Sequence, residues 1–131
     1  MIRLAQLTAP EAATLAHDPR AIVLLPLGAI EQHGPHLPLL VDWRGAEELA
    51  LRVAPHLARA GWRPVLAPPI PYGVSTLAVG CPGTVSLSVP TLRRLIVEVV
   101  TRARTAREAM ALRGRLIAEQ LVRALGNRPR S

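Results

Sequence analysis

Four side chains that can bind a metal ion lie close together early in the sequence. Glu31, His33, His36 and Asp42 follow directly after an apolar run at residues 21–25, and glycine and proline residues interrupt the segment between them. Oxygen and nitrogen donors gathered on a stiff loop are what a divalent metal site requires. Open α/β sheets also bind their ligands outside the carboxyl ends of the strands. The segment is therefore a candidate metal site.

The spacing of these residues supports a shared centre. Glu31 and His33 are two residues apart, and in extended backbone alternate side chains point the same way. Asp42 returns after a proline-bearing loop, and a carboxylate can bridge two ions about 3.5–4 Å apart. The same residues also have a structural interpretation, in which Glu31 accepts backbone hydrogen bonds and His33 braces the loop. His36 fits a hydrogen bond within its own turn as well as support of a metal ligand.

The rest of the sequence predicts alternating strands and helices. A capping box at Thr8 and Glu11 predicts the start of the first helix, and the proline after Asp18 ends it. We expect helices at Ala9–His17, at Gly45–Ala60 and from Pro90 onward, and strands at Ala21–Leu27, Val65–Ala67 and Thr84–Ser88. This order with short connections favours a parallel sheet covered by helices.

Composition limits the class of protein. A chain of 131 residues forms one domain at most, and with two Trp, one Tyr and no Phe its core must be aliphatic. The longest apolar run, Ala21–Ile30, is too short to span a bilayer and contains Pro26. The N-terminus lacks the features of a signal peptide, and the single Cys81 excludes an internal disulfide. We therefore expect a soluble cytoplasmic protein without membrane partners.

The net charge of +7 comes entirely from arginine. Many of the arginines lie between Arg102 and Arg130, where they could bind phosphate non-specifically. No aromatic residue interleaves them and no nucleic-acid module is visible, so nucleic-acid binding is not expected. A basic helical interaction module working through Arg102–Arg123 remains an alternative function.

Three segments resemble one known family. Pro26–Pro38, closed by Asp42, is similar to the signature of the creatininase (creatinine amidohydrolase) family. Tyr72–Ser75 followed by Pro82–Leu87 resembles that family's glycine–serine loop and Pro-Gly-Thr strand, and Leu7–Ala12 resembles its usual start. The resemblance covers residues 5–100 in order.

This resemblance implies a three-layer α/β/α fold with a mainly parallel sheet. It implies that Glu31 binds one divalent ion, His33 a second and Asp42 both, the metal being zinc, manganese or iron. The ions would generate hydroxide from water and polarise an amide carbonyl, so the implied reaction is hydrolysis of a non-peptide or cyclic amide C–N bond. Some relatives instead cleave a short peptide. Gly73 and Ser75 would shape a substrate-side loop. No residue is assigned as catalytic, and we expect a homo-oligomer because relatives form oligomers.

The chain departs from the family pattern in two places. Ala78 and Cys81 stand where the family carries a histidine and an aromatic residue. The family's second metal-binding segment, a glycine-rich histidine loop, is missing, and no histidine follows His56. We therefore predict an internal deletion within a single incomplete domain over residues 1–126. Its front part, residues 1–100, would join the final helix, residues 109–126, and residues 127–131 would form a disordered tail.

Such a deletion has consequences for metal binding and stability. One ion held by Glu31, His33, Asp42 and water is chemically reasonable, although the resemblance implies a binuclear site in the full family, and we expect poor affinity and turnover. The missing strands would expose a sheet edge, which predicts instability or self-association. An inactive truncated relative is the alternative interpretation.

Overall fold

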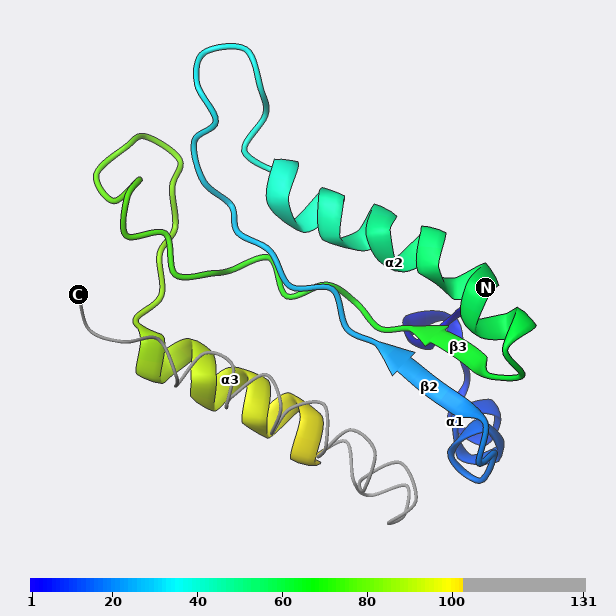
Figure 1. Cartoon of the computed structure of the whole chain (residues 1–131). Coiled ribbons are helices and arrows are strands. Elements are labelled where there is room, and N and C mark those ends of the chain that lie inside the picture. Colours follow the sequence, from blue (N-terminus) through cyan, green and yellow to red (C-terminus); the bar gives the residue numbers. More distant parts are fainter. Residues whose placement is uncertain (103–131) are drawn as a thin grey trace, which may run out of the picture.

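The computed structural model describes residues 1–102, in which strands alternate with helices (Figure 1). The elements in chain order are strand β1 (Ile2–Arg3), the 3-10 helix η1 (Leu4–Gln6), helix α1 (Ala9–Ala16), strand β2 (Ala21–Leu24), helix α2 (Val41–Arg59), strand β3 (Arg63–Leu66) and helix α3 (Val89–Arg102). The predicted final helix at 109–126, the predicted tail at 127–131 and the arginines that follow Arg102 lie outside the described residues.

The three strands form one parallel sheet in the order β1–β3–β2. Central strand β3 pairs Val65 with Ile2 of β1 and with Val23 of β2. Helix α2 makes the crossover from β2 to β3, as parallel pairing requires. The predicted parallel sheet is therefore confirmed.

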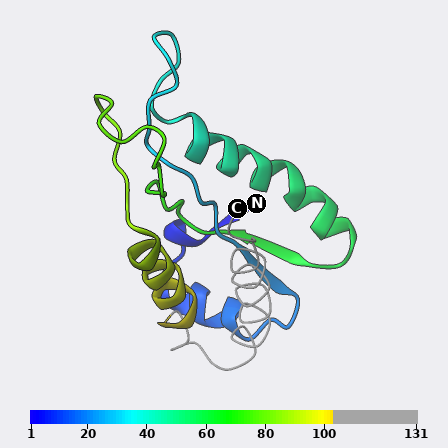
Figure 2. The same cartoon turned by 60° about the vertical axis from the view of Figure 1, so that its left-hand side comes forward.

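Helices cover both faces of this sheet. Helices α1 and α2 lie on opposite sides of β2 and β3 in both views (Figures 1 and 2). On the α1 side, Leu15 packs with Ala21 and Val65, and Val65 has no exposed surface. On the other side α2 contacts β3 and buries Ala54. The predicted α/β fold, with a helix–sheet–helix arrangement, is confirmed, and its core is aliphatic.

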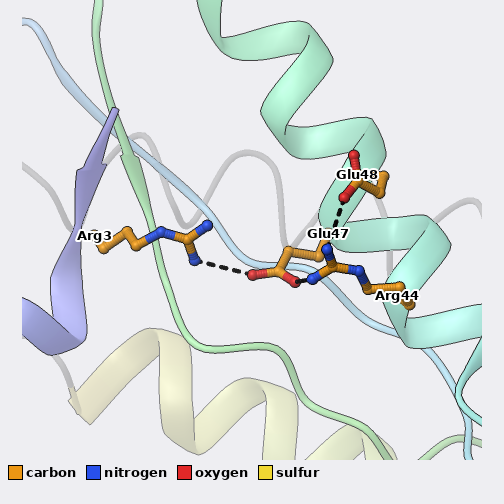
Figure 3. A network of polar contacts seen from close by, with 4 residues as sticks. All are labelled: Arg3, Arg44, Glu47 and Glu48. Atoms are coloured by element: carbon orange, nitrogen blue, oxygen red, sulfur yellow. Dashed lines mark hydrogen bonds and ion pairs between the residues drawn. The ribbon is translucent and has the colours of Figure 1, made fainter.

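A buried carboxylate ties α2 to the edge of the sheet (Figure 3). Glu47 is 7% exposed, and its two oxygens accept hydrogen bonds from Arg3 Nη1 at 3.0 Å and from Arg44 Nη1 at 2.7 Å. Arg44 also pairs with Glu48 at 3.0 Å. A carboxylate is buried at acceptable cost only when it is paired and hydrogen-bonded, as Glu47 is. Since Arg3 belongs to β1, the network sets the orientation of α2.

Two predicted boundaries are wrong near the candidate site. Strand β2 ends at Leu24 and not at Leu27, because Pro26 has no N–H to continue the ladder. Helix α2 begins at Val41 and not at Gly45, so Asp42 lies in the first turn of a helix and not in the loop. An acidic side chain at a helix N-terminus interacts favourably with the helix dipole, so the first turn of α2 is a favourable position for Asp42.

The predicted strand at Thr84–Ser88 is also wrong. Val85 forms a single bridge with Ile30, and Ser86 forms a single bridge with Gly73. Because these two contacts go to different segments, no ladder develops. Strand β1 was not predicted, since two residues are too short for any periodic signal.

Candidate metal centre

Glu31, His33 and Asp42 converge beyond the carboxyl end of β2. Each of the three offers one donor atom, and these atoms all lie within 4.8 Å of one another. Glu31 and His33 come from the loop after β2, and Asp42 comes from the first turn of α2. All three side chains are partly buried, with His33 21% and Asp42 37% exposed. A loop and a helix therefore bring two carboxylates and one imidazole, up to 11 residues apart in sequence, close to one point.

Both ring nitrogens of His33 are engaged. Nδ1 lies 3.0 Å from the backbone carbonyl oxygen of Glu31, and Nε2 lies 3.0 Å from Oδ1 of Asp42. A carbonyl oxygen can only accept, so Nδ1 must carry a proton. With the proton on Nδ1, a neutral ring would have a bare Nε2 facing the Asp42 carboxylate. Both atoms would then be acceptors, so a proton or a metal ion must lie between them. The arrangement thus selects either an imidazolium or a metal-bound neutral imidazole.

The surroundings of His33 favour the imidazolium form of its side chain. Its pKa is raised, first because the ring donates to the Glu31 carbonyl, and further because Asp42 accepts from the ring and both carboxylates attract its charge. Partial burial opposes this shift. A metal ion at Nε2 must displace that proton, so the two cations compete for one site.

The donor set fits a divalent ion. Nitrogen and oxygen ligands lie about 2.0–2.2 Å from zinc, which places two ligands of one ion roughly 3–4 Å apart. The 3.0 Å between His33 Nε2 and Asp42 Oδ1 already has this value. The Glu31 carboxylate lies within 4.8 Å of both other donor atoms. Mixed carboxylate and imidazole ligands suit zinc, manganese or iron.

Backbone contacts fold the ligand loop into this shape. The N–H of Glu31 donates to the carbonyl of Leu39 at 3.3 Å, which brings the two ends of the loop together. Gly34 adopts a positive φ of 79° at the turn, a conformation that side chains disfavour, and its N–H donates to Gln32 Oε1 at 2.9 Å. The N–H of Gln32 donates to Thr84 Oγ1 at 3.1 Å.

A glycine allows the loop to approach the helix that carries Asp42. A Cβ atom added at Gly28 would lie 2.3 Å from both Cα and N of Trp43 and 2.6 Å from the carbonyl carbon of Asp42. No side chain fits at that separation, so the backbone at Gly28 touches the first turn of α2 directly. Gly28 is therefore part of what holds Asp42 beside the loop.

A second loop runs beside the ligand loop. The segments 25–40 and 67–88 extend together beyond β2 and β3 (Figures 1 and 2). After the ladder stops at Pro26, the Gly28 N–H donates to the Ile70 carbonyl at 3.2 Å and the Ile70 N–H donates to the Pro26 carbonyl at 3.0 Å, so hydrogen bonds still join the two segments beyond the strands. The candidate centre therefore rests on a paired backbone and not on an isolated loop.

The other predicted site residues have separate positions. His36 is exposed and does not belong to the group of three potential ligands found within residues 1–102. Gly73 packs against Ala29, where an added Cβ would meet the alanine Cβ at 3.2 Å. Ser75 is 4% exposed, its N–H donates to Ser86 Oγ at 3.0 Å, and its own Oγ is the only buried side-chain polar atom without a partner in the described part of the chain.

Two residues that position the centre had no predicted role. The sequence identified Gly28 and Thr84 only as parts of motifs, because their partners lie 15 and 52 residues away. An open hollow of about 250 Å³ lies elsewhere, at the amino ends of β1 and β3, and is lined by Ile2, Leu7, Glu11, Thr14, Leu15 and Arg63. The hollow is thus separate from the three converging ligands.

No helix within residues 1–102 is both long and apolar enough to cross a membrane.

Comparison with known proteins relates the chain to one family. A family model described as creatininase, creatinine amidohydrolase, matches residues 5–125. A mycofactocin precursor peptide peptidase from Mycolicibacterium smegmatis is 46% identical over 83 residues, which is 63% of this chain and 34% of that protein. The protein of the same name from Mycobacterium ulcerans is 43% identical over 82 residues, or 58% of this chain and 32% of its own length. The aligned part of the chain spans about a third of these relatives.

Solved structures give the same relation at the level of the fold. A tryptophan-to-alanine mutant of creatininase superposes with a TM-score of 0.70 at 24% identity, covering 97% of this chain and 55% of that one. A structure named creatininase Mn superposes with a TM-score of 0.68 at 23% identity, covering 97% and 55%. A creatininase mutant of Zn–Zn type gives 0.67 at 24% identity, covering 95% and 53%.

Proposed function

The chain belongs to the creatininase family, and from that premise we propose that it binds a divalent metal ion through Glu31, His33 and Asp42 and hydrolyses an amide C–N bond. The observation that carries the proposal is the convergence of one donor atom from each of these residues within 4.8 Å. The names of two solved creatininases, which include manganese and zinc, support the choice of metals to test.

The three ligands have different tasks. Asp42 and Glu31 supply negative charge that stabilises the cation, and His33 supplies a neutral nitrogen whose direction is fixed by its bond to the Glu31 carbonyl. When bound, the ion lowers the pKa of water and polarises a carbonyl group. One ion is the form we propose for this chain, since no histidine follows His56 to complete a second site.

A short peptide is the substrate class that we propose to test first. The relatives at 40–46% identity are named for a precursor peptide, whereas the solved creatininases, one of them complexed with creatine, are 23–24% identical. Cyclic and other non-peptide amides form the second class. The loop containing Gly73 and buried Ser75 lies beside the ligand loop and is the proposed substrate side, as its contact with Ala29 supports.

Metal binding is the first test. The full chain is stripped of metal and titrated with zinc or manganese by calorimetry, beside the variants Glu31→Ala, His33→Ala and Asp42→Ala. Each variant should lose at least tenfold in affinity. Matched controls are His17→Ala, which removes an exposed imidazole, and Glu48→Gln, which neutralises a half-exposed carboxylate of α2 outside the group of three. Equal affinity in the three site variants and the controls would refute the proposed ligands.

Hydrolysis is tested separately on the metal-loaded chain. Short peptides and cyclic amides are incubated with the chain, and product is followed by mass spectrometry. Product formation that requires metal and Asp42 would support the proposed reaction. Metal uptake with no turnover of either substrate class would favour an inactive relative.

We also propose that the chain associates with itself and works in the cytoplasm. Large apolar side chains are exposed on and after the second loop, with Leu77 fully exposed, Val79 65% and Val89 64% exposed. Apolar surface of this kind is commonly covered by a partner. Light scattering after size-exclusion chromatography tests the association, and a monomer at micromolar concentration would refute it.

A further inference from the structure

The peptide group between Glu31 and Gln32 is hydrogen-bonded on both sides. Its carbonyl oxygen, that of Glu31, accepts a bond from Nδ1 of His33 at 3.0 Å. Its N–H, that of Gln32, donates to the hydroxyl oxygen of Thr84 at 3.1 Å. A side chain 52 residues away therefore holds the same peptide group that orients the imidazole.

Planarity connects these two bonds mechanically. The C=O and N–H of one trans peptide lie in a single rigid plane and point in opposite directions. Any rotation of the plane that moves the N–H also moves the carbonyl by the same angle. The direction of the carbonyl orients the imidazole ring through Nδ1. The orientation of the ring then sets the position of Nε2, which lies 3.0 Å from Asp42 Oδ1. Thr84 thus acts on the metal-binding nitrogen through two hydrogen bonds and one ring.

Thr84 is itself firmly placed. Its N–H donates to the carbonyl of Cys81 at 3.1 Å, and the next residue, Val85, donates its N–H to the carbonyl of Ile30 at 3.0 Å. Residues 84 and 85 therefore form hydrogen bonds with the ligand loop on both sides of Glu31. The loop is exposed at Gln32 and has no helix or strand of its own, so this external grip supplies the rigidity that ligand geometry needs.

We propose that Thr84 is a positioning residue for the metal ligand His33. It contributes no ligand atom and acts by fixing the Glu31–Gln32 peptide, which in turn fixes the tautomer and the direction of the imidazole. This inference rests on the proposed function, because it assumes that His33 binds metal. Groups that orient a metal-bound histidine typically contribute 10–100-fold to affinity.

The test compares two substitutions of Thr84 with a matched control. Thr84→Val keeps the shape of the side chain but removes the acceptor, and Thr84→Ser keeps the acceptor. Thr14→Val is the control, since the Thr14 hydroxyl donates to the Pro10 carbonyl within α1, away from the centre. Zinc affinity of the folded, full chain is measured by competition with a chromophoric chelator. We expect a 10–100-fold loss in Thr84→Val, near-complete recovery in Thr84→Ser and no change in Thr14→Val.

Nuclear magnetic resonance of the metal-free chain gives a second readout. The Nδ1 proton of His33 should exchange slowly with water in the wild type and in Thr84→Ser, and faster in Thr84→Val. If Thr84→Val loses thermal stability but keeps zinc affinity and proton protection, Thr84 is merely structural and the inference is overturned while the metal site stands. If the wild type itself fails to bind zinc, the proposed function and the inference are both overturned.

Discussion

Gly28 offers a direct test of how Asp42 is brought to the ligand loop. In Gly28→Ala, the new methyl carbon would lie 2.3 Å from two backbone atoms of Trp43. Ordinary van der Waals contacts are at least 3.4 Å long. The backbone at Gly28 does not have positive φ, so alanine meets no conformational obstacle there. The clash with backbone is the sole obstacle, and neither partner is a flexible side chain. The first turn of α2 must therefore retreat by about 1 Å.

A retreat of this size decides between metal binding and its loss. Metal sites tolerate deviations of about 0.2 Å in ligand distance, so a shift of about 1 Å removes Asp42 from the coordination of an ion held by Glu31 and His33. We expect roughly a 100-fold or greater loss of zinc affinity in Gly28→Ala. Overpacking should also lower the free energy of unfolding by about 1–3 kcal/mol.

Gly45→Ala is the matched control for this substitution. Gly45 lies within α2, and an added Cβ there meets nothing within 4 Å. Alanine in a helix interior is favoured over glycine by about 0.5–1 kcal/mol, so Gly45→Ala should be slightly more stable and should bind zinc normally. Calorimetric titration gives the affinity, and urea unfolding of the metal-free chain gives the stability. Zinc affinity in Gly28→Ala equal to that of Gly45→Ala would show that the contact does not position Asp42.

Three further predictions concern the fold that carries the centre. Replacing both arginine partners of Glu47 by methionine should destabilise the chain by about 3 kcal/mol or more in urea unfolding, because a buried carboxylate is left unpaired, whereas Glu47→Met should cost much less since the arginines can reach water. The pKa of Asp18 is lowered, chiefly by its hydrogen bond from the Arg20 side chain. Its contribution to stability is therefore present above the unfolded pKa and is lost as pH falls through the folded pKa, and Asp18→Asn should flatten that acid dependence in thermal unfolding. Val65→Ala should cost about 2–3 kcal/mol by urea unfolding, because Val65 has no exposed surface, and a smaller loss would show that the core collapses around the missing methyl groups.

The sequence carried much of the fold because the central elements have clear local signals. The apolar segment of β2, the amphipathic pattern of α2 and the capping box at Thr8 and Glu11 are all local features. In the structure the Glu11 carboxylate accepts bonds from the N–H and the hydroxyl of Thr8 at 2.8 and 2.7 Å. Parallel pairing followed from the strand–helix–strand order, because short connections leave few other topologies.

The errors fall where pairing partners decide the structure. Residues 84–88 alternate as a strand would, but their backbone groups meet the ligand loop at one residue and the second loop at another. Strand β1 exists because β3 offers it an edge, which no property of Ile2 and Arg3 reveals. The predicted internal deletion stays a prediction, since the proposed junction near Thr105 lies outside residues 1–102, and the predicted oligomer also stays a prediction.

The candidate centre was predicted by residue type, and its geometry depends on contacts that the sequence does not show. Glu31, His33 and Asp42 were identified from chemistry and spacing, and the structure brings them together. Asp42 was expected at the end of the loop, whereas the N-terminal turn of α2 carries it. His36, for which the sequence left open a hydrogen bond within its own turn or support of a metal ligand, is exposed and lies outside the group of three.

The contacts that place the ligands all lie between residues 28 and 85. Gly28 sets the distance from the loop to α2, Leu39 closes the loop, and Thr84 fixes the peptide that orients His33. The Thr84 contact depends in turn on the pairing of β2 with β3, since that pairing brings the 67–88 segment beside the 25–40 segment. A chain that aligns with about half of the creatininase structure compared above can therefore still bring the three candidate ligands together. We therefore expect the metal affinity of the proposed centre to depend on the packing of the sheet and the loops as well as on the three candidate ligands.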